Sequence, residues 1–248
     1  MSFRVLITTT SFLETRGGHI ELLERSGLDI VTARGPLNSA SLIALIEQQG
    51  PFEGALVGED EFTNDVFEAL GESFKVLSRY GAGVDKIDLE SARRHGVTVT
   101  NTPGATHEAV AELAFGLLLG LVRSIPEENS IVHQGLWRRF TGRELSGKTI
   151  GVFGLGGVGQ EMSKRALAFG MKVLVHNTSW SSFHQSFVEE SNRIFSSSLF
   201  KNRDPQISRL ERIEDVLRQS DVLTLHMNLN KNTEFFINRR TLSHCKRG

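Results

Sequence analysis

Three glycines near the middle of the chain have the spacing of a phosphate-binding turn. Residues 149–153 form a short β-branched run, and Gly154-x-Gly156-x-x-Gly159 follows at once, before the helix-like segment 161–170. In such a strand–turn–helix the first glycine permits a tight turn, the second lets the backbone approach a pyrophosphate, and the third lets the helix pack closely on the strand. The free N–H groups and the dipole at the helix start favour an anion. The spacing therefore indicates a dinucleotide-binding turn.

A second group of glycines, Gly81-Ala82-Gly83, follows another strand-like segment. Exposed backbone N–H groups in a turn without bulky side chains suit an anion. Such glycines equally form a plain tight turn, which the residues alone favour by roughly two to one. Arg79 either adds positive charge beside this turn or is solvated. Thr106 and His226 are also ambiguous, because a hydroxyl at a helix start is an ordinary N-cap and a histidine that closes an apolar strand more often has a structural role.

Strand-like and helix-like segments alternate along the chain, which predicts parallel sheets covered by helices on both faces. In the first hundred residues we expect strands at 4–10, 28–33, 52–57, 74–78 and 97–100. We expect helices there at 18–26, 39–49 (capped by Ser39), 63–70 and 88–95. A helical stretch at about 105–125, and another up to about Trp137, precede the second alternation. Its strands are expected at 149–153, 172–176 and 221–226, and its helices at 158–170 and 211–219.

Length and composition fit two globular domains of the α/β class. The chain has 248 residues, of which 39% are hydrophobic and 23% charged, and its formal net charge of −1 provides no electrostatic attraction for nucleic acid or an anionic membrane. The longest apolar run, 109–122, is interrupted by Glu112 and is too short to span a bilayer. A single cysteine, Cys245, excludes an internal disulfide framework, and the N-terminus has no signal-peptide pattern. We therefore expect a cytoplasmic protein with no nucleic-acid or membrane partner.

Further motifs occur on either side of the glycine turn. They are Arg79-Tyr-Gly-Ala-Gly-Val-Asp-Lys-Ile-Asp88, Asn101-Thr-Pro-Gly-Ala105, Ala109-Val-Ala-Glu112 and Ser220-Asp-Val-Leu-Thr-Leu-His226. With these motifs the chain resembles the D-isomer-specific 2-hydroxyacid dehydrogenase family, and most closely its phosphoglycerate dehydrogenase branch. The resemblance covers nearly all of the chain outside residues 178–207. It implies a flavodoxin-like substrate domain at 1–101 and an NAD(P)-binding Rossmann domain, a doubly wound parallel sheet, at 102–248.

The resemblance also implies which residues bind substrate and cofactor. The backbone of Gly81, Ala82 and Gly83, with Arg79 beside it, would hold the carboxylate of a small 2-hydroxy or 2-keto acid. Contacts on the nicotinamide side of the cofactor would fall near Thr106. The remaining cofactor contacts would come from the glycine turn and the ends of two later strands: Gly154, Gly156, Gly157, Val158, Gly159, Asn177, His226, Met227 and Asn228.

Two positions depart from the family pattern. Asn177 stands where an acidic residue normally accepts hydrogen bonds from the adenosine ribose hydroxyls. An amide lacks that charge and does not repel a 2′-phosphate. Thr178 and Ser179 could donate to such a phosphate, although no arginine follows directly, so NAD and NADP both stay open with a slight preference for NADP. Met227-Asn228 stands where the family usually has a proline. This change alters the stiffness of the loop but does not distinguish NAD from NADP.

Residues for the chemical step are not found. The family uses an arginine, a glutamate and a histidine after the strand that ends at His226, and none of the eight histidines falls at the matching position. We therefore expect no catalytic residue and no metal site in residues 1–248, a Rossmann sheet without its last strands, and an unpaired edge at 221–226. On its own the chain should be poorly soluble and inactive, as the N-terminal portion of a longer enzyme. A corepressor-like nucleotide-binding protein without turnover and a non-functional fragment are the alternatives.

Two segments carry further expectations. The helical region 105–140 is expected to form a homodimer interface, as it does in the family, with Trp137 anchoring the helix pair. Residues 178–207 follow no clear period and are expected to be a surface insertion or a short helical excursion. The alternative is a basic flap in which Arg193, Lys201 and Arg203 reach over the cofactor.

Overall fold

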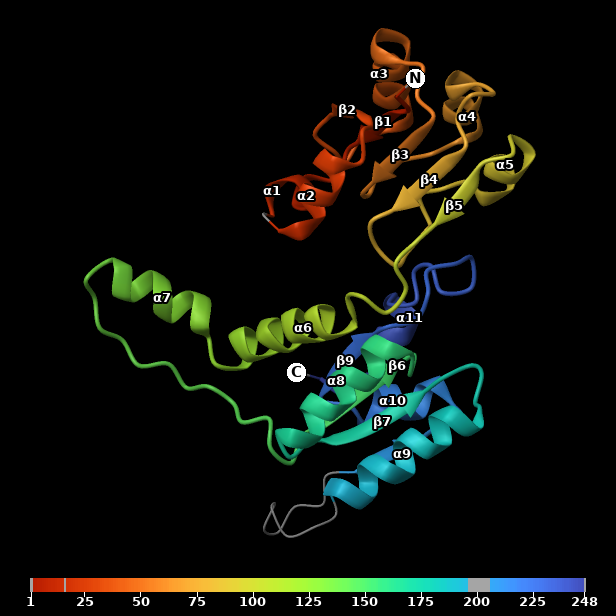
Figure 1. Cartoon of the computed structure of the whole chain (residues 1–248). Helices are drawn as coiled ribbons and strands as arrows, with labels where there is room; N and C mark the ends of the chain where they lie inside the picture. Colours follow the sequence, from red (N-terminus) through yellow and green to blue (C-terminus); the bar gives the residue numbers. More distant parts are fainter. Residues whose placement is uncertain (1, 16, 196–205, 248) are drawn as a thin grey trace. The chain divides into compact units, whose positions relative to one another are not determined.

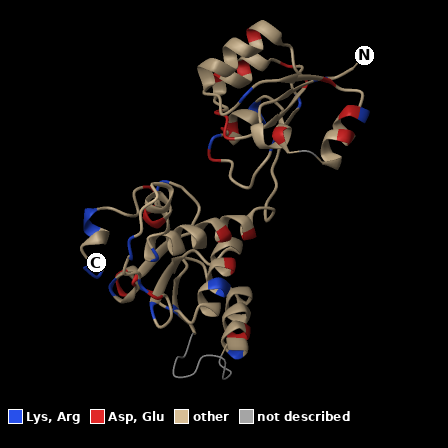
Figure 2. Cartoon of the chain, turned by 90° about the vertical axis from the view of Figure 1, so that its left-hand side faces the viewer, with Lys and Arg blue, Asp and Glu red and all other residues tan. Residues whose placement is uncertain are grey.

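The computed structural model describes residues 2–15, 17–195 and 206–247, and the chain folds as two compact units. The first unit extends to Thr106 and the second begins at His107. Each unit contains one parallel sheet with helices packed on it (Figure 1), so the expected α/β class is confirmed. Lys and Arg are interspersed with Asp and Glu over both units (Figure 2), in keeping with the formal net charge of −1.

The first unit has a five-stranded parallel sheet in the order β2-β1-β3-β4-β5. This is the flavodoxin-like order. The strands are β1 (Arg4–Ile7), β2 (Asp29–Thr32), β3 (Gly54–Val57), β4 (Val76–Arg79) and β5 (Thr98–Thr100). The helices are α1 (Thr10–Glu14), α2 (Gly18–Arg25), α3 (Ser39–Gln49), α4 (Asn64–Leu70) and α5 (Leu89–Arg94).

An apolar core holds the helices of the first unit on its sheet. Its largest fully buried side chains are the phenylalanines Phe52, Phe62, Phe67 and Phe74. Burial of such side chains is the main favourable term in folding.

Two expectations about the ends of elements in this unit are wrong. The first strand ends at Ile7, and α1 begins where the strand was expected to finish, at Thr10. The cap of α3 is Asn38 rather than Ser39, because the Asn38 side chain accepts a hydrogen bond from the N–H of Ser41 at 2.9 Å.

The second unit has a four-stranded parallel sheet in the order β8-β7-β6-β9, which corresponds to 3-2-1-4 of a Rossmann sheet. The strands are β6 (Thr149–Phe153), β7 (Lys172–His176), β8 (Ile207–Arg209) and β9 (Val222–Leu225). The helices are α6 (His107–Val122), α7 (Ile125–His133), α8 (Gly157–Ala168), α9 (Ser182–Phe195), α10 (Ile213–Gln219) and α11 (Arg239–Leu242). Within the described residues β9 pairs only with β6, so the strand expected at 221–226 lies at an edge of the sheet.

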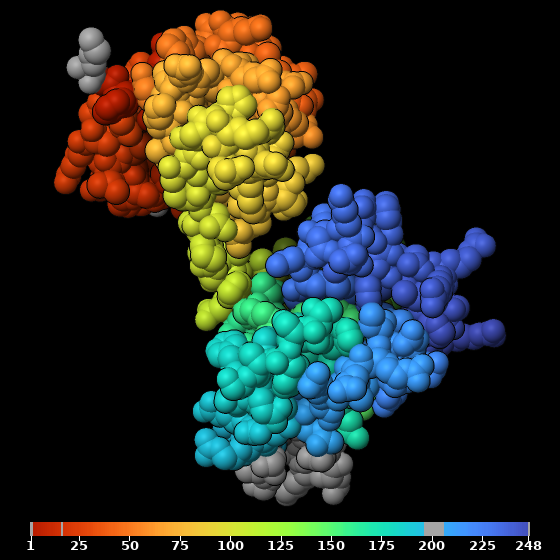
Figure 3. All heavy atoms as spheres, turned by 90° about the vertical axis from the view of Figure 1, so that its right-hand side faces the viewer, coloured from red at the N-terminus to blue at the C-terminus, as the bar shows by residue number. Residues whose placement is uncertain are grey.

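Of the expected surface insertion or short helical excursion at 178–207, the described residues contain a helix, which is packed into the second unit rather than added onto its surface. Helix α9 occupies 182–195 and forms part of the surface of the second unit (Figure 3), and Val188 and Ser191 of this helix are buried. The side chain of Asn192 binds both backbone polar groups of Ile207, at 2.7 and 3.0 Å, and β8 then pairs with β7. The segment therefore supplies a helix and a strand of the Rossmann sheet. Of the basic flap, Lys201 and Arg203 lie outside the described residues.

Helix α6 packs on α8, whereas α7 and the chain after it lie away from the sheet (Figure 1). The buried residues of α6 are Ala111, Phe115 and Leu118, and α7 has none. Trp137 is 85% exposed, so it does not anchor the two helices within this chain. Among the described helices none is individually long and apolar enough to cross a bilayer; α6 and α7 reach that length only together, and they are bent by 67° at their junction.

Candidate functional site

The glycine turn lies between β6 and α8, at the C-terminal ends of the parallel strands. Gly154 has a φ angle of +94°, and a Cβ at this position would lie 2.8 Å from the backbone of His226. A Cβ at Gly159 would overlap the carbonyl oxygen of Gly154. The fold itself therefore requires both glycines.

Gly156 is not required by the fold in this way. Its φ angle is −70°, which any residue adopts, and a Cβ there would have no atom within 4 Å. Gly156 precedes the first turn of α8, where the N–H groups lack partners within the helix. Open space in front of such N–H groups is the arrangement that accommodates a phosphate.

His107 explains why the turn also has a glycine at position 157. A Cβ on Gly157 would overlap the His107 ring, so the first residue of α6 packs against the first residue of α8. Thr106, the nicotinamide-side candidate, directly precedes His107 and is the last residue of the first unit. His107 was not among the residues predicted from the sequence. The only feature of the sequence that could have identified it is its position next to Thr106.

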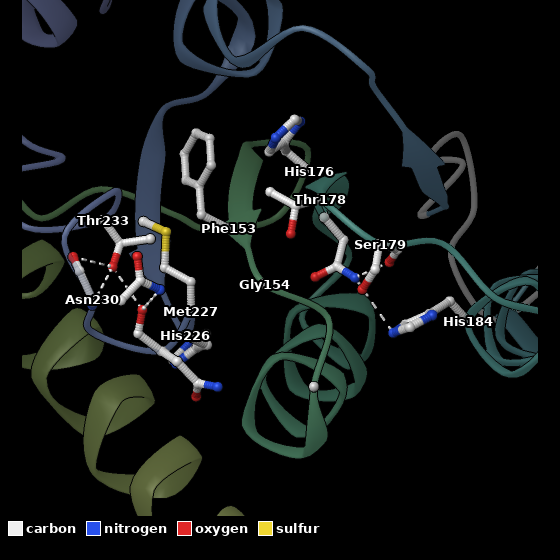
Figure 4. A pocket seen from close by; sticks show the side chains of 13 residues that line it. Phe153, Gly154, His176, Thr178, Ser179, His184, His226, Met227, Asn230 and Thr233 are labelled. Atoms are coloured by element: carbon white, nitrogen blue, oxygen red, sulfur yellow. Dashed lines mark hydrogen bonds between the residues drawn. The ribbon is translucent and has the colours of Figure 1, made fainter. Parts of the chain in front are cut away.

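A cavity of about 340 Å³ opens beside the glycine turn (Figure 4). Residues that follow β6, β7 and β9 line it, and they include six of the expected cofactor contacts: Gly154, Gly156, Asn177, His226, Met227 and Asn228. Gly157, Val158 and Gly159 lie in the first turn of α8 instead. His184, from α9, also lines the cavity, and the sequence did not point to it because a helix within 178–207 was expected without bounds or a defined face.

Asn177 connects the end of β7 to the glycine turn. Its Oδ1 accepts a hydrogen bond from the N–H of Leu155 at 3.0 Å, and its Nδ2 donates to the carbonyl oxygen of Ser179. The amide therefore stabilises the turn and leaves N–H, not oxygen, toward the cavity.

His226 holds the end of β9 beside the same turn. Its backbone N–H donates to the carbonyl oxygen of Phe153 at 2.8 Å, and its Nε2 lies 2.7 Å from Oγ1 of Thr224. Burial lowers the pKa of His226 because it disfavours the charged imidazolium, so the ring is neutral at pH 7. Within the described residues no carboxylate lines the cavity, and no His, Cys, Asp and Glu side chains are grouped as metal ligands.

In the first unit, the turn after β4 has four consecutive carbonyl oxygens bound by donors. The bonds run from Arg79 Nη1 to Tyr80, from the N–H of Thr102 to Gly81 (3.0 Å), from Asn101 Nδ2 to Ala82 (2.7 Å) and from Arg79 Nε to Gly83 (3.1 Å). Among the described residues no acceptor binds the N–H of Ala82 or Gly83. Two neighbouring donors therefore stay available for an anion.

Arg79 is the side chain that holds this turn together. It is only 8% exposed, and Nη2 forms an ion pair with Glu59. The alternative of a solvated Arg79 is therefore wrong. Its guanidinium lies behind the turn, where a planar fork of donors can bind several oxygens at once.

Comparison with known proteins agrees with this geometry. Residues 115–248, just over half of the chain, match the model of the D-isomer specific 2-hydroxyacid dehydrogenase NAD-binding domain. The chain belongs to this dehydrogenase family. The expected cofactor, NAD or NADP, is thereby confirmed at the level of the family, as are the Rossmann fold and the resemblance inferred from the motifs.

Several members of the dehydrogenase family are similar to the chain over most of its length. Hydroxypyruvate reductase of Thermotoga maritima is 35% identical over 188 residues, which are 75% of this chain and 54% of that protein. D-3-phosphoglycerate dehydrogenase of Bacillus subtilis is 35% identical over 201 residues, or 79% of this chain and 34% of that protein. A solved structure of a Thermus thermophilus protein has a TM-score of 0.78 at 32% identity, covering 99% of this chain and 71% of that chain. The chain thus spans about half of one curated relative and about a third of the other.

Two glycine substitutions distinguish what the fold requires from what a ligand requires. Gly159→Ala forces a methyl group onto the Gly154 carbonyl and should lower the free energy of unfolding by about 1–3 kcal/mol. Gly156→Ala has space for its methyl and should cost about 1 kcal/mol or less. It should nevertheless weaken dinucleotide binding by about tenfold, because the methyl obstructs a charge-assisted hydrogen bond. Urea unfolding and titration calorimetry measure the two effects, and a Gly156→Ala variant that binds like the parent chain contradicts the assignment.

Arg79→Lys tests whether the guanidinium holds the turn of the first unit. An ammonium group cannot reach all three oxygen acceptors, so we expect the free energy of unfolding to fall by about 1–3 kcal/mol. Arg93→Lys is the matched control, since Arg93 is exposed on α5 of the same unit, and it should change stability by about 0.5 kcal/mol or less. If both variants have the same urea midpoint, Arg79 does not have this role.

Proposed function

We propose that this chain is part of an NAD(P)-dependent oxidoreductase that acts on the CH–OH group of a D-2-hydroxy acid, such as 3-phosphoglycerate or glycerate, or on a 2-keto acid such as hydroxypyruvate. The observation that carries the proposal is the cavity beside the glycine turn, where Gly156 leaves open space in front of α8. The cavity lies at the C-terminal ends of β6, β7 and β9, which is where doubly wound sheets bind dinucleotides. The names of the Thermotoga maritima and Bacillus subtilis relatives support this substrate class.

In this proposal the first unit binds the substrate carboxylate. The N–H groups of Ala82 and Gly83 are the donors, and the bound carbonyl oxygens of the same turn face away from the anion. Arg79 positions the turn from behind and shares its charge with Glu59. The first unit would then be the substrate domain and the second the cofactor domain.

The nicotinamide, when bound, accepts or donates the hydride. Residues 154–159 would hold the diphosphate, and Thr106 would lie on the nicotinamide side. The chemical step also needs a cation for the substrate and a base for its hydroxyl proton. After His226 the sequence does not contain an arginine, a glutamate and a histidine in that order. We therefore propose that residues 1–248 bind the cofactor without turning over a substrate.

Titration of NADH and NADPH into the 1–248 chain tests this function. We expect saturable binding of at least one of them, because all the residues proposed to hold the diphosphate, 154–159, belong to the second unit. We expect no change in nicotinamide absorbance when hydroxypyruvate is added to the chain with NADH or NADPH. We expect none either when 3-phosphoglycerate is added with the oxidised cofactor. If neither dinucleotide binds, the proposed function is refuted. Turnover of either acid would contradict the proposed inactivity of residues 1–248.

We also propose that α6 and α7 form the interface of a homodimer. On α6 the residues Val110, Leu113, Leu117 and Leu121 are exposed at helical spacing, on a different face from the buried Ala111, Phe115 and Leu118. Leu136 and Trp137, which follow α7, are exposed as well. We expect the partner to be a second copy of the chain, because this region is the dimer interface in the family. Burying the exposed apolar side chains of α6 against that copy would remove them from water.

Leu117→Glu should disrupt such a dimer, because it places a charge in the middle of the apolar stripe. Leu22→Glu is the matched control: Leu22 is 73% exposed on α2 of the first unit, comparable to the 67% of Leu117. Sedimentation equilibrium should give a dimer for the parent chain and the control, and a monomer for Leu117→Glu. A monomeric parent chain, or a dimeric Leu117→Glu variant, would overturn this interface.

A further inference from the structure

The orientation of the Asn177 amide is determined by its two neighbours. A backbone N–H can only donate, so the atom that faces Leu155 at 3.0 Å must be Oδ1. The carbonyl oxygen of Ser179 can only accept, so the atom that faces it must be Nδ2. These two contacts agree, and they direct N–H of Asn177 toward the cavity.

The protonation of the His184 ring follows from the same kind of argument. Its Nδ1 lies 3.1 Å from the backbone N–H of Ser181 and 2.8 Å from the Ser181 hydroxyl. Because the backbone N–H must donate, Nδ1 is the unprotonated nitrogen and Nε2 carries the hydrogen. The ring of Trp180 stacks on the imidazole at a centroid distance of 5.5 Å, and that of Phe183 meets it edge-on at 5.9 Å, which holds Nε2 in place.

Two donors therefore face each other at the edge of the cavity. Nδ2 of Asn177 and Nε2 of His184 are 3.4 Å apart, and neither has a lone pair to offer the other. Such a contact is unfavourable until an acceptor binds both N–H groups. Thr178 and Ser179 line the same part of the cavity and add hydroxyl groups that can also donate.

We propose that this cluster of Asn177, Thr178, Ser179 and His184 binds the 2′-phosphate of NADP(H), so that the chain selects NADPH over NADH. The inference rests on the proposed function and specifies its cofactor. A 2′-phosphate offers several acceptor oxygens and suits converging donors. A free 2′-hydroxyl instead is recognised by a carboxylate acceptor at this position, and the Asn177 oxygen is already bound to Leu155.

Arg209 supplies positive charge near this cluster. It ends β8, next to the end of β7, and its guanidinium carbon lies 4.6 Å from the centroid of the Trp180 ring. Trp180 is the ring that stacks on His184. The positive charge of Arg209 is thus one aromatic ring away from the proposed phosphate site, and among the described residues its ion-pair partner is Glu211, at 4.0 Å.

Calorimetric titration of the 1–248 chain with NADPH and NADH tests the inference, with 2′,5′-ADP and 5′-AMP as probes of the adenosine end alone. We expect NADPH to bind at least tenfold more tightly than NADH, and 2′,5′-ADP more tightly than 5′-AMP by a similar factor. His184→Ala should weaken NADPH about tenfold and leave NADH unchanged, since only one charge-assisted hydrogen bond is lost. Asn177→Asp should reverse the preference, because a carboxylate repels the phosphate and accepts from ribose.

Two controls separate specificity from folding. His133→Ala removes an exposed histidine from α7, away from the cavity, and should leave both affinities unchanged. His184→Gln keeps an N–H donor on this side chain and should retain most of the preference. Unchanged NADH affinity in His184→Ala shows that the cavity is intact.

The outcomes distinguish the two proposals. If NADH binds as tightly as NADPH, or if His184→Ala weakens both equally, the phosphate site is refuted while the proposed function stands. If neither dinucleotide binds, the proposed function fails and this inference fails with it.

Discussion

The close approach of α8 to β6 is the contact on which the second unit depends. Gly154 and Gly159 bring the helix start so near the strand end that a Cβ would overlap backbone atoms, and this holds the first N–H groups of α8 over the edge of the sheet. Since β6 pairs with both β7 and β9, the residues that follow these neighbours lie beside the same turn. The cavity, Asn177 and His226 are thus positioned by a single packing constraint.

Asn177 changes what the cavity offers to a ligand. A carboxylate at this position could bind the Leu155 N–H with one oxygen and keep the other for a ribose hydroxyl. The amide uses its only oxygen on Leu155 and presents an N–H instead, so an acceptor site becomes a donor site. His226 does not add charge there, because burial lowers its pKa. The departure from the family pattern is therefore compatible with the fold, and in our proposal it determines the choice of cofactor.

Features of the fold could be predicted from the sequence where the interacting residues are close together along the chain, and not where they are far apart. The glycine spacing is predictive because Gly154 and Gly159 meet each other across five residues, and strand–helix alternation identified both parallel sheets for a similar reason. The bounds and the packing of helix α9 were not predicted, because one of its buried positions is a serine, Ser191, which interrupts the apolar period. The ion pair joins Arg79, at the end of β4, to Glu59 in the loop after β3, twenty residues apart, and no local sequence pattern predicts such a partner. His184 was missed because the bounds of α9, which carries it, were not predicted.

The anion sites proposed for the two units both consist of main-chain N–H groups. In the first unit Arg79 and Asn101 bind carbonyl oxygens of the turn, and in the second the close packing of Gly159 on Gly154 fixes the turn. Hydrogen bonds of this kind depend on backbone geometry more than on net charge, which accords with a chain whose formal net charge is −1. Substitutions other than those to proline leave the main-chain N–H donors in place. Changes at the edge of the cavity, such as at Asn177 and His184, are therefore expected to alter ligand preference while the proposed diphosphate site is retained.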